Sequence, residues 1–87
     1  MEKLLTELEQ GVEGKIISVS GGRGLQRRLW ALGFVEGQTI RKLSALALGG
    51  PVVVLINRAQ IAIGRGIAKR IVVSTYGNEI GRGNAGQ

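Results

Sequence analysis

The stretch that decides the fold runs from Lys15 to Phe34 and reads KIISVSGGRGLQRRLWALGF. Its first part, residues 15–20, is rich in β-branched side chains, which predicts a strand. The glycine-rich segment at 20–24 follows as a loop, because clustered glycines interrupt regular structure. The stretch therefore predicts a strand, a flexible connection and the start of a helix.

The helix is expected over residues 24–32. Leu25, Leu29 and Leu32 recur at a spacing that gives a helix one apolar face. Gly33 comes directly after the last leucine, where a glycine commonly ends a helix in the left-handed conformation. One short amphipathic helix is thus predicted after the first strand.

The rest of the chain reads mainly as short strands separated by glycine turns. We expect an irregular strand at 38–48, explained either by a bulge or by a strand that switches from one sheet edge to another, and a hairpin turn at 57–60. The remaining predicted elements are a turn or helix at 3–9, strands at 52–56, 61–63 and 70–75, and a short turn at 67–69. Five strands with one inserted helix predict a mainly β fold, a small antiparallel barrel. We assign residues 1–76 to this domain and 77–87 to a disordered glycine-rich tail.

Composition excludes several kinds of chemistry. The 87 residues contain neither Cys nor His. A disulfide scaffold, a zinc ribbon and a thiol nucleophile therefore cannot be built, and the most common catalytic base is missing. Six scattered glutamates offer oxygen ligands only, which do not select a transition metal. We expect no enzyme activity, no cofactor and no resident metal.

Charge is distributed unevenly along the chain. Residues 1–14 carry four glutamates and one lysine, a net charge of −3, whereas residues 15–87 carry eleven basic residues and two glutamates, a net charge of +9. A basic body attracts nucleic acid, acidic lipid headgroups or an acidic protein surface, although it also serves solubility alone.

The basic residues of the predicted helix form the candidate binding site. Arg23, Arg27 and Arg28 lie away from the leucine face, so they can form one cationic ridge, or simply a solvated helix face. The position of Trp30 favours packing beside the core, and the alternative is an exposed anchor for a partner. Arg65 lies in a second glycine-rich segment, which could extend the ridge. Neither glycine-rich segment ends in the Gly-Lys-Ser/Thr of a nucleotide-binding loop, so both are interpreted as turns.

No targeting or membrane-spanning segment is expected. Glutamates near the start do not fit a signal peptide, and the longest uncharged stretch, 43–57, is short and interrupted by Gly49-Gly50-Pro51. The expected location is cytoplasmic.

The ordered chain between Leu5 and Val73 resembles the ferrous iron transport protein A (FeoA) family. The resemblance rests on an ordered set of motifs: Gly11, Arg28-Leu29, Leu32-Gly33-Phe34, Gly37, Leu48-Gly49, Pro51, and Ile63 before Ala68 and Ile71. It implies an SH3-like barrel with a small helical insertion. It also implies a small cytosolic accessory protein, not an enzyme, that works with a membrane ferrous iron permease carrying a GTP-binding domain.

Three hypotheses of function follow. The leading one is a regulatory adaptor that binds the cytoplasmic side of such a permease, with support from an anionic membrane surface. Its candidate contact residues are Arg23, Arg27, Arg28, Trp30 and Arg65. The alternatives are a basic nucleic-acid-binding barrel, weakened by the scarcity of stacking aromatic residues, and self-association through an exposed strand edge.

Overall fold

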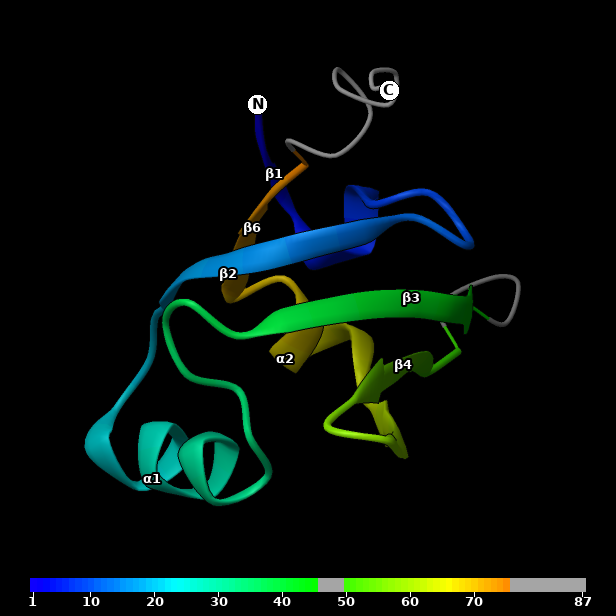
Figure 1. Ribbon diagram of the computed structural model, residues 1–87. Coiled ribbons are helices and arrows are strands. Elements are labelled where there is room, and N and C mark those ends of the chain that lie inside the picture. The colour runs from blue at the N-terminus through cyan, green and yellow to red at the C-terminus, as the bar shows by residue number, and fades with distance from the viewer. Residues whose placement is uncertain (46–49, 76–87) are drawn as a thin grey trace.

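The structure, a computed structural model, describes residues 1–45 and 50–75 (Figure 1). Six antiparallel strands form one sheet in the order β1-β6-β2-β3-β4-β5. The elements in chain order are β1 (Glu2–Leu4), the 3-10 helix η1 (Leu5–Glu7), β2 (Glu13–Val19), α1 (Arg23–Ala31), β3 (Thr39–Ala45), β4 (Val52–Ile56), β5 (Ala59–Ile63), α2 (Arg65–Ala68) and β6 (Ile71–Ser74). The predicted mainly β architecture with an inserted helix is confirmed.

Two irregularities bend this sheet. The register shifts between Ile16 and Ser18 where β2 pairs with β6, and between Lys42 and Ser44 where β3 pairs with β4. Bulges increase the local twist of a strand, so the sheet curls around the core instead of lying flat. For the strand predicted at 38–48, which is β3, the structure thus shows the bulge, one of the two expected explanations of its irregular pattern.

The core is aliphatic, as the scarcity of aromatic residues requires. Alternate residues of β4 point inward, namely Val52, Val54 and Ile56. Phe34, which is fully buried, is the one aromatic side chain among the buried core residues of the described chain. The other buried apolar side chains are Leu5, Leu8, Ile16, Leu29, Ile40, Ile63, Ala68, Ile71 and Val73.

Helix α1 occupies the connection between β2 and β3 (Figure 1). The amide Nε2 of Gln26 donates to the carbonyls of Val19 and Gly21 at 3.2 and 3.1 Å, which ties the helix to the end of β2. The helix ends at Ala31, and Gly33, which follows the cap residue Leu32, has a φ of +102°, which confirms the predicted left-handed glycine. These contacts hold α1 in one orientation beside the sheet.

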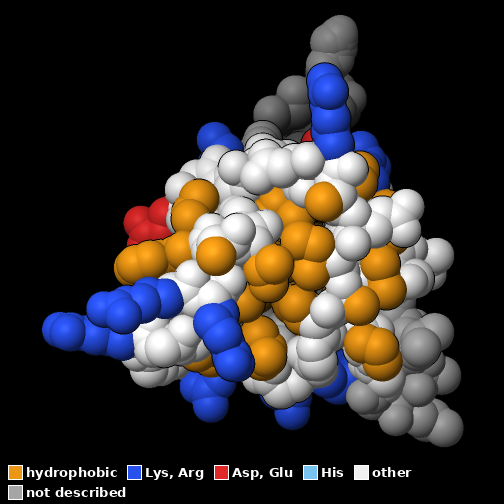
Figure 2. Space-filling model, turned by 90° about the horizontal axis from the view of Figure 1, so that it is seen from below, with side chains coloured by type: hydrophobic (Ala, Val, Ile, Leu, Met, Phe, Trp, Pro, Cys, Tyr) orange, Lys and Arg blue, Asp and Glu red, His pale blue; other side chains and the backbone are white. Residues whose placement is uncertain are grey.

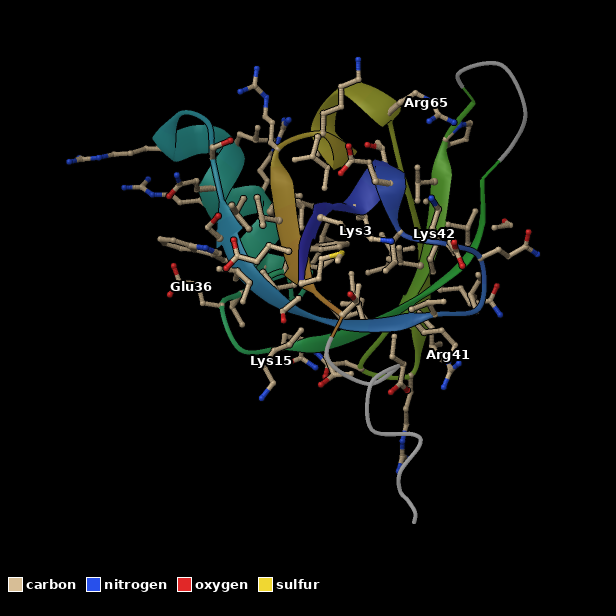
Figure 3. The ribbon with its side chains drawn as sticks, turned by 90° about the horizontal axis from the view of Figure 1, so that it is seen from above. Lys3, Lys15, Glu36, Arg41, Lys42 and Arg65 are labelled. Atoms are coloured by element: carbon tan, nitrogen blue, oxygen red, sulfur yellow. The ribbon has the colours of Figure 1, made fainter. Side chains whose placement is uncertain are left out.

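A buried lysine fastens the N-terminal segment to the sheet. The Nζ of Lys42 on β3 donates to the carbonyls of Leu8, Thr6 and Leu5 at 2.6, 3.0 and 3.4 Å, and its side chain is only 5% exposed. Burial, together with the neighbouring charge of Arg65, lowers the pKa of Lys42 below its usual value (Figure 3). Lys42 thus secures η1 at the centre of the molecule.

The structure corrects two of the predicted elements, and other predictions fall partly or wholly outside the described residues. The segment 3–9 is predicted as a turn or helix, and Leu5–Glu7 within it does form the 3-10 helix η1. Glu2–Leu4, however, forms a strand that pairs with β6, so the sheet has six strands and not five. Residues 2–4 become a strand because they pair with β6, which is distant in the chain, and the local sequence pattern does not reveal such pairing. Of the short turn expected at 67–69, the first two residues belong to α2, which begins at Arg65, and Lys69 is the C-terminal cap of that helix. The end of the predicted strand 38–48 and the predicted tail 77–87 lie outside the described residues.

Candidate partner-binding surface

Helix α1 presents two different flanks. A helix turns by about 100° per residue, so Arg23, Arg27 and Trp30 fall on one side, and the leucines fall on the other. We name the first flank the arginine–tryptophan face and define it as Arg23, Gln26, Arg27 and Trp30, which together line a shallow hollow of about 270 Å³. Three of the five predicted contact residues therefore lie together.

Trp30 is 52% exposed, so the preference for core packing is wrong. Its neighbour Leu29 takes the inward position on the helix and is only 2% exposed. A second hollow, of about 440 Å³, continues from Trp30 and Gln26 over Val19, Val35 and Glu36. The indole thus stands between a cationic region and a partly apolar one that carries a single carboxylate.

The opposite flank of α1 borders an apolar groove. Its walls are α1 on one side and β5 with α2 on the other, and its volume is about 450 Å³. Figure 2 shows apolar side chains gathered across this face of the molecule, with basic side chains around them. We name this feature the leucine groove; its lining residues are Leu25, Arg28, Leu29, Ala31, Leu32, Ala62, Ile63, Gly64 and Ile67.

The leucine stripe of α1 is only partly used by the core. Leu29 is buried, Leu25 is half-buried and Leu32 remains 46% exposed. The leucine spacing predicts the stripe but not the groove, because the opposite wall comes from residues at least thirty positions further along the chain. The one available signal was the position of the last leucine of the stripe, Leu32, directly after the end of the helix at Ala31.

The structure separates the other two predicted residues from the arginine–tryptophan face. Arg28 lines the leucine groove instead. Arg65 is half-buried on α2, and Figure 3 shows it on the side of the molecule away from α1, near Lys42. The predicted ridge is therefore divided into three places, and the assignment of these residues to partner binding stays a prediction.

Two further observations concern the described part of the chain. No helix there is long and apolar enough to cross a membrane. Within residues 1–45 and 50–75, no three acidic side chains gather in a way that could hold a metal ion.

The fold and these surfaces define a small SH3-like β-barrel domain that displays a cationic helix and an apolar groove. The FeoA domain model matches residues 3–75. This match spans most of the chain, and the chain therefore belongs to the FeoA family, which is involved in ferrous iron transport. No curated protein sequence matches the chain.

Solved structures of the same family agree with this assignment. A crystal structure of an iron uptake regulatory protein (FeoA) is 30% identical, with a TM-score of 0.78, and covers 85% of this chain and 97% of its own. The FeoA protein from Chlorobium tepidum is 28% identical, with a TM-score of 0.81, and covers 98% and 81% respectively. A manganese-dependent transcriptional repressor shares the fold at 21% identity and a TM-score of 0.78, over 41% of its own chain.

Proposed function

We propose that this protein is an accessory protein of ferrous iron uptake that binds the cytoplasmic, GTPase-containing part of a ferrous iron permease. The observation that carries the proposal is the leucine groove, together with membership of the FeoA family. The proposed contact lies in this groove and at Arg28.

The groove has the features of a protein-docking site. Protein interfaces place apolar anchors in a concave centre and charged groups at the rim. Here Leu32 leaves nearly half of its surface exposed in the monomer, and Ile63 and Ile67 supply the facing wall. Covering such apolar surface is favourable by roughly 25 cal/mol per Å². The groove therefore suits an apolar side chain of a partner.

Arg28 adds selectivity to this apolar contact. Its side chain is exposed beside the groove, and α1 carries four basic or amide side chains and no acidic one. An acidic group next to the apolar anchor of the partner would pair with the guanidinium. We therefore expect the segment that docks here to combine aliphatic and acidic residues.

Binding of the purified cytosolic part of the permease, measured by calorimetry, tests the proposal. Leu32→Asp places a carboxylate in the groove, and we expect it to weaken binding at least tenfold, a loss of about 1.4 kcal/mol. The double substitution Arg27→Glu with Arg28→Glu should weaken it similarly, mostly through Arg28.

Matched control variants separate the groove from general effects of charge. Ile17→Asp introduces the same change at an exposed apolar residue of β2, and Lys15→Glu with Lys69→Glu alters the net charge as much as the arginine pair does. Both controls should bind within about twofold of the wild type, with an unchanged circular dichroism spectrum. Equal binding by the Leu32→Asp variant would rule out the groove, and no binding by the wild type would end the proposal.

A further inference from the structure

We propose that the arginine–tryptophan face is a docking surface for anionic lipid headgroups, with the Trp30 ring placed at the boundary between headgroups and acyl chains. This inference goes beyond binding to the permease, and it does not depend on that binding. It places a second function on the flank of α1 that the leucine groove does not use.

The charge of this face suits an anionic lipid surface. Arg23 and Arg27 are both exposed, lie one helical turn apart and line the same hollow as Trp30. A basic residue close to an anionic leaflet contributes about 1 kcal/mol, which corresponds to roughly fivefold in affinity. Glu36 is the one carboxylate among the residues that line the two hollows beside Trp30, and it opposes this attraction.

The apolar part of the face favours lipid over nucleic acid. Trp30 is half-exposed, and Val35, in the hollow that Trp30 borders, is 37% exposed. Tryptophan is enriched where headgroups meet acyl chains, because its ring is apolar and its N–H can still donate a hydrogen bond. Stacking on single-stranded nucleic acid usually uses several aromatic side chains, and Trp30 is the only tryptophan in the chain. An aliphatic neighbour such as Val35 gains from an acyl layer and not from a phosphate backbone.

The geometry lets both surfaces of α1 act at once. Arg23 and Leu32 are nine residues apart, so they point in directions about 180° apart around the helix. Docking of the arginine–tryptophan face on lipid therefore leaves the leucine groove accessible. A protein that binds a membrane-embedded partner gains from such an arrangement, because confinement to the bilayer surface raises the effective concentration.

The test uses the full chain and vesicles that contain no permease. Vesicles made of equal parts phosphatidylcholine and phosphatidylglycerol are compared with vesicles of phosphatidylcholine alone, at low and at physiological ionic strength. We expect co-sedimentation with the anionic vesicles only, weakened by salt, and a blue shift of the fluorescence of Trp30, which reports on this residue alone.

Three variants connect the binding to this face. Arg23→Gln with Arg27→Gln should weaken partition about 30-fold, the product of two losses of roughly 1 kcal/mol. Glu36→Gln should strengthen partition, because it removes the opposing charge. Lys15→Gln with Lys69→Gln removes the same charge from exposed positions that do not line this face, and partition should fall by less than about threefold.

Each alternative outcome overturns the inference. Absence of binding to anionic vesicles ends it, as does binding without any change in the fluorescence of Trp30. If the two double variants lose partition equally, general charge and not this face is responsible. If the chain instead binds a DNA oligonucleotide at the same ionic strength and Arg23→Gln with Arg27→Gln removes that binding, the face serves nucleic acid.

Discussion

Replacement of Lys42 by methionine tests how the N-terminal segment is held. The Nζ donates to the carbonyls of Leu8 and Thr6 at 2.6 and 3.0 Å, and more weakly to that of Leu5 at 3.4 Å. Each buried carbonyl that loses its donor costs about 1–3 kcal/mol, and relief of the buried charge offsets part of that cost. We expect Lys42→Met to lower the free energy of unfolding by about 2 kcal/mol.

Thermal and urea denaturation, followed by circular dichroism, measure this change. For a domain of this size, a loss of about 2 kcal/mol lowers Tm by roughly 8–16 °C. The control is Arg41→Met on the same strand. Arg41 also donates to a carbonyl, that of Gly11 at 2.7 Å, and pairs with Glu13 at 2.8 Å, but this pair is about half exposed. The control should therefore lose less than about 1 kcal/mol.

The comparison can also refute the reasoning. If the free energy of unfolding of Lys42→Met equals that of the wild type to within about 0.5 kcal/mol, the lysine does not stabilise the segment. Either the three carbonyls find other donors, or the cost of burying the amine equals the stabilisation from its hydrogen bonds. If Arg41→Met is the more damaging of the two, burial is not what distinguishes them. Hydrogen exchange provides an independent check, because loss of the Lys42 contacts should expose the amides of η1 and the following turn.

The remaining predictions concern pH, a glycine and two leucines. Because the pKa of Lys42 is lowered in the folded state, the unfolded chain binds more protons between that pKa and 10.5. Stability relative to Lys42→Met should therefore rise, in urea titrations, as the pH increases towards 10.5, and a falling difference would contradict the burial argument. Gly33→Ala should cost about 1–2 kcal/mol, because its φ is +102° and an added Cβ would lie 2.9 Å from Nδ2 of Asn57. Gly24→Ala, in α1 with open space around it, should instead add about 0.5–1 kcal/mol; equal urea midpoints for the two variants would contradict this reasoning. Leu29→Ala should cost about 2–5 kcal/mol, and Leu32→Ala less than about 1 kcal/mol while weakening permease binding; calorimetric unfolding of both separates core from groove.

The sequence predicted those helices and turns that are specified by residues close together in the chain. The helix came from the leucine spacing and from Gly33, and the structure places α1 one residue earlier than expected, at Arg23–Ala31. The hairpin turn predicted at 57–60 is confirmed at Asn57 and Arg58, whose positive φ values of 50° and 68° are those of a two-residue hairpin turn. The other two residues of the prediction, Ala59 and Gln60, already belong to β5 and pair with β4. Strand β1 was missed because its three residues become a strand only by pairing with β6.

In the candidate site, too, the sequence predicted what depends on neighbouring residues and not what depends on tertiary packing. The sequence indicated that Arg23, Arg27 and Trp30 belong to one helix, and the angular spacing of a helix is enough to bring them to one face. It could not reveal that Arg65 lies beside Lys42, because nothing in the spacing of these residues specifies how α2 packs against η1. Nor could it show that Leu32 faces a groove and not the core, since that depends on the distance between α1 and β5.

By itself, the sequence determined the class of the fold, the aliphatic nature of its core, the cationic character of its helix and the membership of the FeoA family that the domain match then showed. These properties follow from composition and from short-range periodicity, which are written in consecutive residues. Only the tertiary structure decided which side chains are exposed and which lie together: Trp30 outside the core, Lys42 inside it, and the leucine groove between α1 and β5. The physical reason is that burial depends on contacts between segments distant in the chain, and such contacts exist only after the sheet has curled around its core.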